Sequence, residues 1–141
     1  MSNEDILIVL RKLEDVVNEH ARLIKYAKQD LIRVRRDPED YDSQLRLLGL
    51  LNKFRSIRRT IANSIAVVLN TNDSASETYM LTTTLLEYML LVGFDNEEEI
   101  IRRARLLASN GAKMLMREMD EFAEDLRQIN DLRRELNKLL S

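Results

Sequence analysis

Residues 6–34, ILIVLRKLEDVVNEHARLIKYAKQDLIRV, decide the fold of this chain. Nine positions in this stretch follow one another at alternating steps of four and three residues, and all but one are apolar: Ile6, Leu10, Leu13, Val17, His20, Ile24, Ala27, Leu31 and Val34. This spacing is typical of one face of a long α-helix. One helix cannot bury such a face alone, so we expect the rest of the chain to supply helices of similar length.

The composition agrees with a helical protein that folds as one domain, residues 1–141. Of the 141 residues, 45% are hydrophobic and 33% are charged, while only 3 are glycine and 1 is proline. A chain with few turn-forming residues has few turns, and therefore few and long elements. No stretch alternates apolar and polar residues, so we expect no strand.

Several functional classes are disfavoured by composition. The chain contains no cysteine, which excludes disulfides, thiolate metal ligands and cysteine nucleophiles. A net charge of −2 gives no general attraction to nucleic acid or to anionic membranes. The acidic N-terminus lacks the basic region of a signal peptide, and no apolar run reaches the ~20 residues that span a bilayer. These features predict a soluble, cytoplasmic protein.

The first two helices are expected at about 3–36 and 38–70. Ser2 is the expected N-cap of the first, and Asp37, followed by Pro38 in the first turn, is that of the second. The connection is short, so the second helix should fold back antiparallel on the first. Its apolar stripe comprises Leu47, Leu50, Phe54, Ile57, Ile61, Ile65 and Val68.

The third helix is expected at about 76–92. Ser74 and Glu77 have the spacing of a capping box, and Gly93 suits a left-handed residue just past the helix end. The segment is apolar on most sides, which predicts a central helix covered from several directions.

A fourth helix is expected at about 96–140, with Asp95 and Glu98 as its capping pair. Asn110-Gly111 is a strong turn signal, yet the apolar spacing continues through it. Two alternatives remain, namely one long helix or a break that makes five helices. The prediction is therefore an all-α antiparallel bundle of four long helices, or five if the chain breaks near Asn110-Gly111.

Small and soft residues are interpreted as packing devices. Gly49 lies inside the second helix, where glycine costs about 1 kcal/mol relative to alanine, and a close helix crossing is the usual reason to keep it. A close helix approach also explains four small residues of the fourth helix: Ala104, Ala108, Gly111 and Ala112. The methionines are interpreted mainly as core fillers, and otherwise as an adaptable binding surface: Met80, Met89, Met114, Met116 and Met119.

His20 is the only histidine and the first candidate for chemistry. As a general base or a metal ligand it would need partners, whereas Asp15 and Glu19 point away from its face of the helix. The Glu-x-x-His spacing of di-iron bundles is absent. We therefore interpret His20 as a structural residue at the boundary of the core, and expect no catalytic residue, metal ligand or cofactor.

Two charge clusters are interpreted as solvated faces. The basic set could attract phosphate, but acidic residues lie among its members and no glycine-rich phosphate loop accompanies it. This set comprises Arg33, Arg35, Arg36, Arg46, Lys53, Arg55, Arg58 and Arg59. The acidic run fans around its helix instead of converging on one cation. It comprises Glu118, Asp120, Glu121, Glu124 and Asp125.

The expected capping residues at every helix start, the short loops and the charged faces resemble computationally designed helical bundles. Other features look natural: the Thr82-Thr83-Thr84 run, Gly49, Asn110-Gly111, and Asn52 and Asn63 at positions that look buried. A design assembled from pieces of natural helical proteins would explain both the design-like and the natural features. It implies that functional residues of the parent proteins would remain in the chain without their function.

Two functions are consistent with these observations. The first is a designed or structural helical scaffold with no biochemical activity and no required partner. The second is a natural interaction module that binds a partner helix in an apolar groove around the third and fourth helices. An enzyme is not expected, because no nucleophile or acid–base constellation is visible. The unequal helix lengths leave ends through which a second copy could pair.

Overall fold

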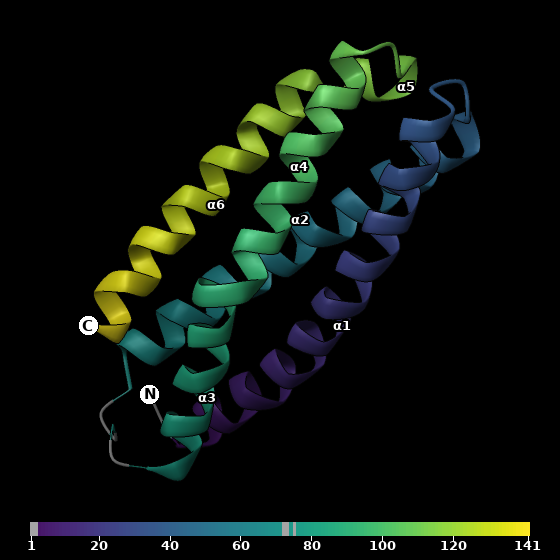
Figure 1. Cartoon of the computed structure of the whole chain (residues 1–141). Coiled ribbons are helices and arrows are strands. Elements are labelled where there is room, and N and C mark those ends of the chain that lie inside the picture. The colour runs from purple at the N-terminus through teal and green to yellow at the C-terminus, as the bar shows by residue number, and fades with distance from the viewer. Residues whose placement is uncertain (1–2, 72–73, 75) are drawn as a thin grey trace.

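The computed structural model describes residues 3–71, 74 and 76–141 (Figure 1). This part of the chain is helical and contains no strand. The elements are α1 (Asn3–Arg36), α2 (Tyr41–Leu69), α3 (Glu77–Tyr88), the π-helical segment η1 (Met89–Gly93), α4 (Phe94–Ser109), α5 (Lys113–Met116) and α6 (Met119–Leu140). None of the helices within these ranges is both long and apolar enough to cross a membrane.

The helices form a bundle of four rods, in which each rod is antiparallel to the next one along the chain. Because α3, η1 and α4 follow one another without a break, they make up one rod, and α1, α2 and α6 are the other three. Rods that follow one another along the chain run in opposite directions, so two contacting pairs run the same way: α1 with the α3–η1–α4 rod, and α2 with α6 (Figure 1). Contacts join α1 to α2 and α4, and α6 to the same two helices, so the four rods enclose one core. The expected all-α bundle is confirmed.

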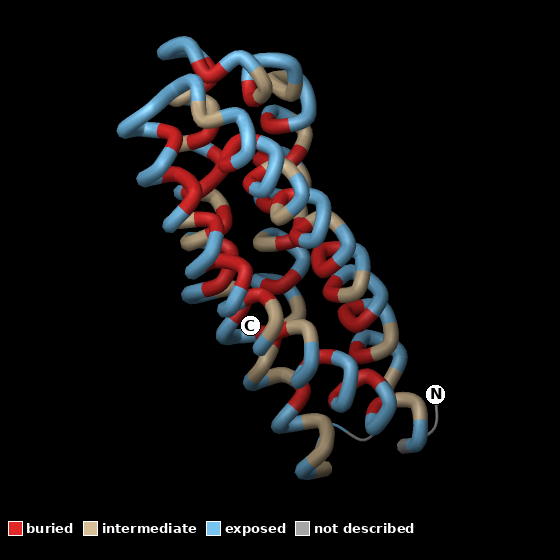
Figure 2. The backbone as a smooth tube through the Cα atoms, turned by 90° about the vertical axis from the view of Figure 1, so that its right-hand side faces the viewer, coloured by how far each residue is buried: buried red, intermediate tan, exposed pale blue. Residues whose placement is uncertain are grey.

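The periodic stripes in the sequence form this core. All nine positions of the first stripe are buried, including His20. The second stripe is buried as well, except Leu50, which is half-buried. Figure 2 shows buried and exposed segments alternating along each rod, as expected for helices that bury one face each.

The chain breaks at Asn110-Gly111, which confirms the alternative with the additional helix. Gly111 has a φ of 109°, a left-handed conformation that favours glycine, and the N–H of Ala112 bonds to the carbonyl of Leu107. The short α5 and then α6 follow. The expected continuous helix over 96–140 is therefore wrong, because the Asn-Gly turn overrides the apolar spacing.

The expected boundary between the third and fourth helices is also wrong. Gly93 has right-handed helical angles (φ −59°, ψ −52°), so it does not end a helix. The backbone passes through the π-helical turn η1 directly into α4. Asp95 and Glu98 therefore lie on a continuing rod and cap nothing.

Two other caps lie a few residues from their expected positions. Asp40, not Asp37, caps α2 and accepts hydrogen bonds from the backbone N–H and the hydroxyl of Ser43. Asp37 instead accepts a bond from the N–H of Glu39 within the turn. The helix α3 is capped by Ser76 instead of Ser74. The expected cap Ser2 lies outside the described residues.

The helix α3 is peripheral, which contradicts the expectation of a central helix. Only Thr82 and Leu86 of its residues are buried, and its other apolar side chains are partly or largely exposed. The high apolar content of this segment therefore led to the wrong prediction that the helix is central. Only Met89 among the methionines named above is a core residue, while Met80 and Met116 are exposed and the other two are half-buried.

The glycine and asparagine interpretations also need correction. Gly49 is exposed, and a Cβ added to it would meet no atom within 4 Å, so no helix crosses there. Asn52 and Asn63 are exposed too. By contrast, Ala104, Ala108 and Ala112 are fully buried, as expected for a close helix approach. Gly111, the fourth small residue of that prediction, is exposed in the turn, so a close approach does not explain it.

Candidate functional site

A network of charged side chains lies inside the bundle, with one member from each rod. Nε2 of His20 (α1) is 2.7 Å from Oε1 of Glu97 (α4). The guanidinium of Arg58 (α2) donates hydrogen bonds both to Oε2 of Glu97 and to Oδ1 of Asp125 (α6). Only 1% of His20, 3% of Arg58 and 0% of Glu97 is exposed. We call these four residues the buried network.

The charges of the buried network are balanced by a fifth side chain at its edge. Arg55, a half-buried residue of α2, donates from Nε to Oδ1 of Asp125 at 2.8 Å and from Nη2 to Oδ2 at 2.9 Å. This bidentate bond to Asp125 raises the pKa of the Arg55 guanidinium. Two guanidinium groups thus face two carboxylates, and because a carboxylate only accepts, His20 donates its bond to Glu97.

The position of each member follows from helical periodicity. His20 occupies a position of the first apolar stripe, and Arg58 lies four residues after Phe54 and three before Ile61 in the second. Glu97 lies three residues after the buried Phe94, and Asp125 lies three residues after the buried Phe122. Residues three or four apart lie on one face of a helix, so all these side chains point into the core.

Gly93 leaves space for the side chain of Met89, which lies beside the histidine. A Cβ added to Gly93 would lie 2.7 Å from Sδ of Met89 and 3.6 Å from Cε1 of His20. The rings of Phe54 and Phe94 complete the enclosure, with centroids 5.1 Å and 6.5 Å from that of the imidazole. His20 is therefore held by packing as well as by its hydrogen bond.

The chemical capacity of the buried network is limited by its access to solvent. A groove of about 240 Å³ between α2 and α6 reaches Arg58 and Gln128, but its lining does not include His20 or Glu97. These two side chains already bond to each other, because Nη2 of Arg58 donates to Oε1 of Gln128 at 3.1 Å. Within the described residues, no three His, Asp or Glu side chains are placed to hold a metal ion.

The structure corrects three interpretations of charged residues. His20 was expected at the core boundary and is fully buried. Arg58 and Asp125 were assigned to solvated faces and are buried partners of each other. Glu97, which lies between the expected capping residues Asp95 and Glu98, is the acceptor for His20. One signal was present in the sequence: each of these charges has the three- or four-residue spacing of the neighbouring core residues.

The rest of the basic set is on the surface. Arg33 and Arg46 both contact Oδ1 of the buried Asp30, at 3.2 Å and 3.4 Å. Arg35, Arg36, Lys53 and Arg59 are exposed. In the acidic run, Asp120 and Glu121 are exposed, and Glu118 and Glu124 are half-buried. These residues fit the expected solvated faces.

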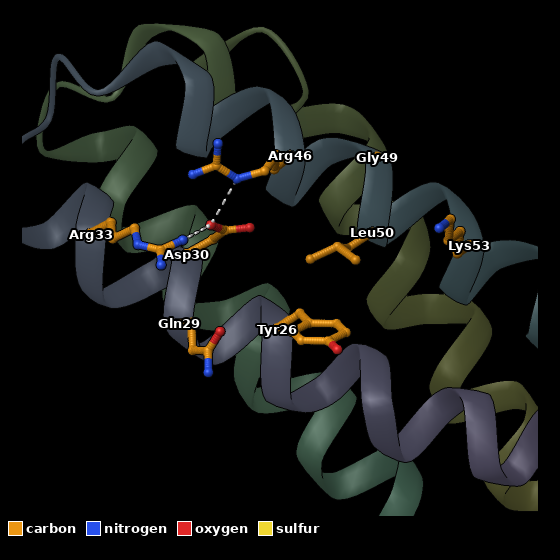
Figure 3. A pocket seen from close by; sticks show the side chains of 8 residues that line it. All are labelled: Tyr26, Gln29, Asp30, Arg33, Arg46, Gly49, Leu50 and Lys53. Carbon is orange, nitrogen blue, oxygen red and sulfur yellow. Dashed lines mark hydrogen bonds and ion pairs between the residues drawn. The ribbon is translucent and has the colours of Figure 1, made fainter.

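A groove of about 400 Å³ lies between α1 and α2 (Figure 3). Arg33 and Arg46 converge on Asp30 at one end of it, while Tyr26 and Leu50 face each other farther along. Its volume suits a small ligand. However, Asp30 already engages both guanidinium groups.

The outer face of α3 and η1 carries a group of exposed apolar side chains. We call it the apolar row, and it comprises Met80, Leu81, Tyr88, Leu91 and Val92. Met80 and Leu91 are each 60% exposed. Tyr88 lies seven residues after Leu81 and three and four residues before Leu91 and Val92, spacings that keep side chains on one side of a helix.

The threonines of α3 add to the apolar row. The hydroxyls of Thr83 and Thr84 donate to the carbonyl of Met80, at 3.0 Å and 2.8 Å. Bonds of this kind satisfy the hydroxyl within its own helix. These two hydroxyls are therefore satisfied within α3.

Comparisons with known proteins bring no further assignment. The chain matches no protein-family model, and no curated protein or solved structure shows significant similarity to it.

Proposed function

We propose that this protein is a non-catalytic helical scaffold that binds a helix of a partner protein on the apolar row of α3 and η1. The observation that carries the proposal is the exposure of five apolar side chains on one helix face. Such rows at helical spacing are how amphipathic helices recognise one another. Contiguous exposed apolar surface often marks interaction sites.

The π-helical segment supports this assignment. A π-helical turn inserted into a helix is rare and frequently lies at a functional site. Here it keeps Met89 and Gly93 in the core while Leu91 and Val92 stay exposed. The exposed row thus extends beyond α3 without loss of core packing.

The absence of a catalytic role is part of the proposal and rests on the buried network. His20 and Glu97 resemble an oriented acid–base pair, but Phe54 and Phe94 enclose the imidazole. The charged groups bond to one another, leaving none directed at a substrate. A role in positioning the four rods accounts for this arrangement.

A binding experiment tests the proposal. The probe is a fluorescent 18-residue amphipathic peptide with leucines at helical spacing and glutamines elsewhere, measured by anisotropy. We expect saturable binding to the parent protein and its loss in Leu91→Glu, because a carboxylate would enter the apolar contact. Leu45→Glu is the matched control, since Leu45 is 51% exposed and lies near the start of α2, away from α3. Equal binding by all three proteins, or by none, would refute the proposal.

A further inference from the structure

We infer that the partner helix is positively charged along the edges of its apolar face. This inference rests on the proposed function, because it concerns the occupant of the same apolar row. It follows from the exposed acidic residues of α3 beside the row, and from the length of the row.

The charged side chains of the segment that carries the apolar row all have one sign. Between Arg59 and Arg102 the sequence contains no lysine or arginine, although it contains seven acidic residues. Glu77 precedes the row, Glu87 lies along its side and Asp95 follows it. Both Glu77 and Glu87 are exposed, and neither forms an ion pair within the described residues. Asp95 pairs with Arg133 of α6.

Uncommitted carboxylates beside an apolar surface select for cations on the partner. A lysine or arginine at the edge of an apolar helix face keeps its methylenes on the apolar contact and reaches outward with its charge. Glu77 and Glu87 offer acceptors for such groups. Complementary charge at the rim of an interface chiefly sets the choice of partner and the association rate.

The length of the row sets the size of the occupant. From Met80 to Val92 the rod rises by about 18 Å, at about 1.5 Å per residue. A partner helix of three to four turns covers it. A second copy of this chain fits less well, because pairing two such faces brings the acidic edges together and like charges oppose association.

Three peptides with the same leucine row distinguish the inference from the proposed function. Their remaining positions carry lysine, glutamine or glutamate. We expect the lysine peptide to bind about tenfold more tightly than the glutamine peptide, and the glutamate peptide to bind more weakly than either. The lysine preference should shrink as salt is raised from 0.05 M to 0.5 M, because exposed charges are screened.

A double variant of the acidic residues beside the row tests whether they cause the preference for the lysine peptide. Glu77→Gln with Glu87→Gln should remove most of the lysine preference while leaving binding of the glutamine peptide unchanged. Glu39→Gln with Glu121→Gln, which removes the same charge at the opposite end of the bundle, should leave the preference intact. The same loss in both double variants would overturn the inference, since it would reflect net charge alone.

The outcomes separate the two proposals. Equal affinity for the three peptides overturns the inference and leaves the proposed function standing. No binding of any peptide overturns both. A concentration-dependent dimer in light scattering that Leu91→Glu abolishes would assign the row to a second copy of the chain, and would also overturn the inference.

Discussion

His20 on α1 donates a 2.7 Å hydrogen bond to Glu97 on α4, 77 residues away in the chain and inside the bundle. Glu97 in turn accepts from Arg58, which also donates to Asp125. This chain of bonds links all four rods. These bonds fix the positions of the four rods relative to one another, whereas apolar contacts alone would allow the helices to slide or rotate.

Removing Glu97 should destabilise the protein strongly. Glu97→Ala leaves His20 without its acceptor and Arg58 with one buried carboxylate instead of two. Breaking a buried ionic group in this way typically costs about 3–5 kcal/mol. Urea denaturation measures the change in the free energy of unfolding. Glu99→Ala, two residues along on an exposed position, should stay within about 0.5 kcal/mol of the parent.

Replacing the whole buried network should cost much less than removing one member. His20→Leu, Arg58→Met, Glu97→Leu and Asp125→Leu together leave no uncompensated charge among these four positions, and apolar packing can match or exceed a buried ionic cluster. The same denaturation experiment applies. If the fourfold variant were as unstable as Glu97→Ala, the cost would lie in cavities or in the stranded Arg55, and not in unpaired charge within the network.

The two helical glycines should respond to alanine with opposite signs. Gly49→Ala should stabilise the protein by about 1 kcal/mol, because the site is open and alanine favours the helix. Gly93→Ala should destabilise it by about 1–3 kcal/mol, because the new Cβ would crowd Met89 beside His20. Thermal or urea unfolding measures both. Stabilisation by Gly93→Ala would mean that the core there is looser than described.

Ser76 and Ser74 provide a test of where α3 begins. The hydroxyl of Ser76 accepts the N–H of Tyr79 at 3.1 Å. Ser76→Ala should cost about 1 kcal/mol, the usual value for an N-cap. Ser74→Ala should have little effect on unfolding by urea. The reverse order would support the capping box expected from sequence.

Glu98 should contribute to the acid sensitivity of the protein. Hydrogen bonds from Arg102 and then from Arg133 hold the pKa of Glu98 below its ordinary value of 4.5. Because the folded pKa is depressed, this stabilisation is fully present above about pH 4.5 and is lost as the pH falls through the folded value.

The measurement is the free energy of unfolding between pH 6 and pH 2. Glu98→Gln should flatten its decline below about pH 4.5, whereas Glu99→Gln, which replaces a neighbouring carboxylate without an ion pair in the described structure, should follow the parent. An unchanged acid slope in Glu98→Gln would show that the bonds to Arg102 and Arg133 do not stabilise the fold.

The periodicity of apolar residues made the helical fold predictable, but it did not predict the charged residues buried inside the bundle. The steps of four and three residues from Ile6 to Val34 identify a buried face without any knowledge of its neighbours. Glu97 and Asp125 keep the same spacing relative to Phe94 and Phe122, yet a charge is normally read as solvated. Their burial depends on Arg58, which lies 39 and 67 residues away, and local sequence does not encode that pairing.

The end of the third helix shows a second limit. Gly93 and the acidic residues after it have the composition of a helix stop followed by a new start. The structure instead continues through η1, with Gly93 buried against Met89 in the core. In the sequence, a glycine that packs in the core, such as Gly93, therefore looks the same as a glycine that ends a helix. The exposure of α3 could not be predicted from its sequence either, because an apolar helix face can pack against the protein's own core or against a partner protein.

Methyl NMR gives the most direct test of the proposed partner surface. Selectively labelled leucine, valine and methionine methyls are followed while the lysine-edged peptide is added. We predict that the shifts concentrate on Met80, Leu81, Leu91 and Val92, and leave Leu45 unmoved. Shifts confined to the groove between α1 and α2, or spread evenly over the bundle, would contradict the assignment of α3 and η1 as the binding face.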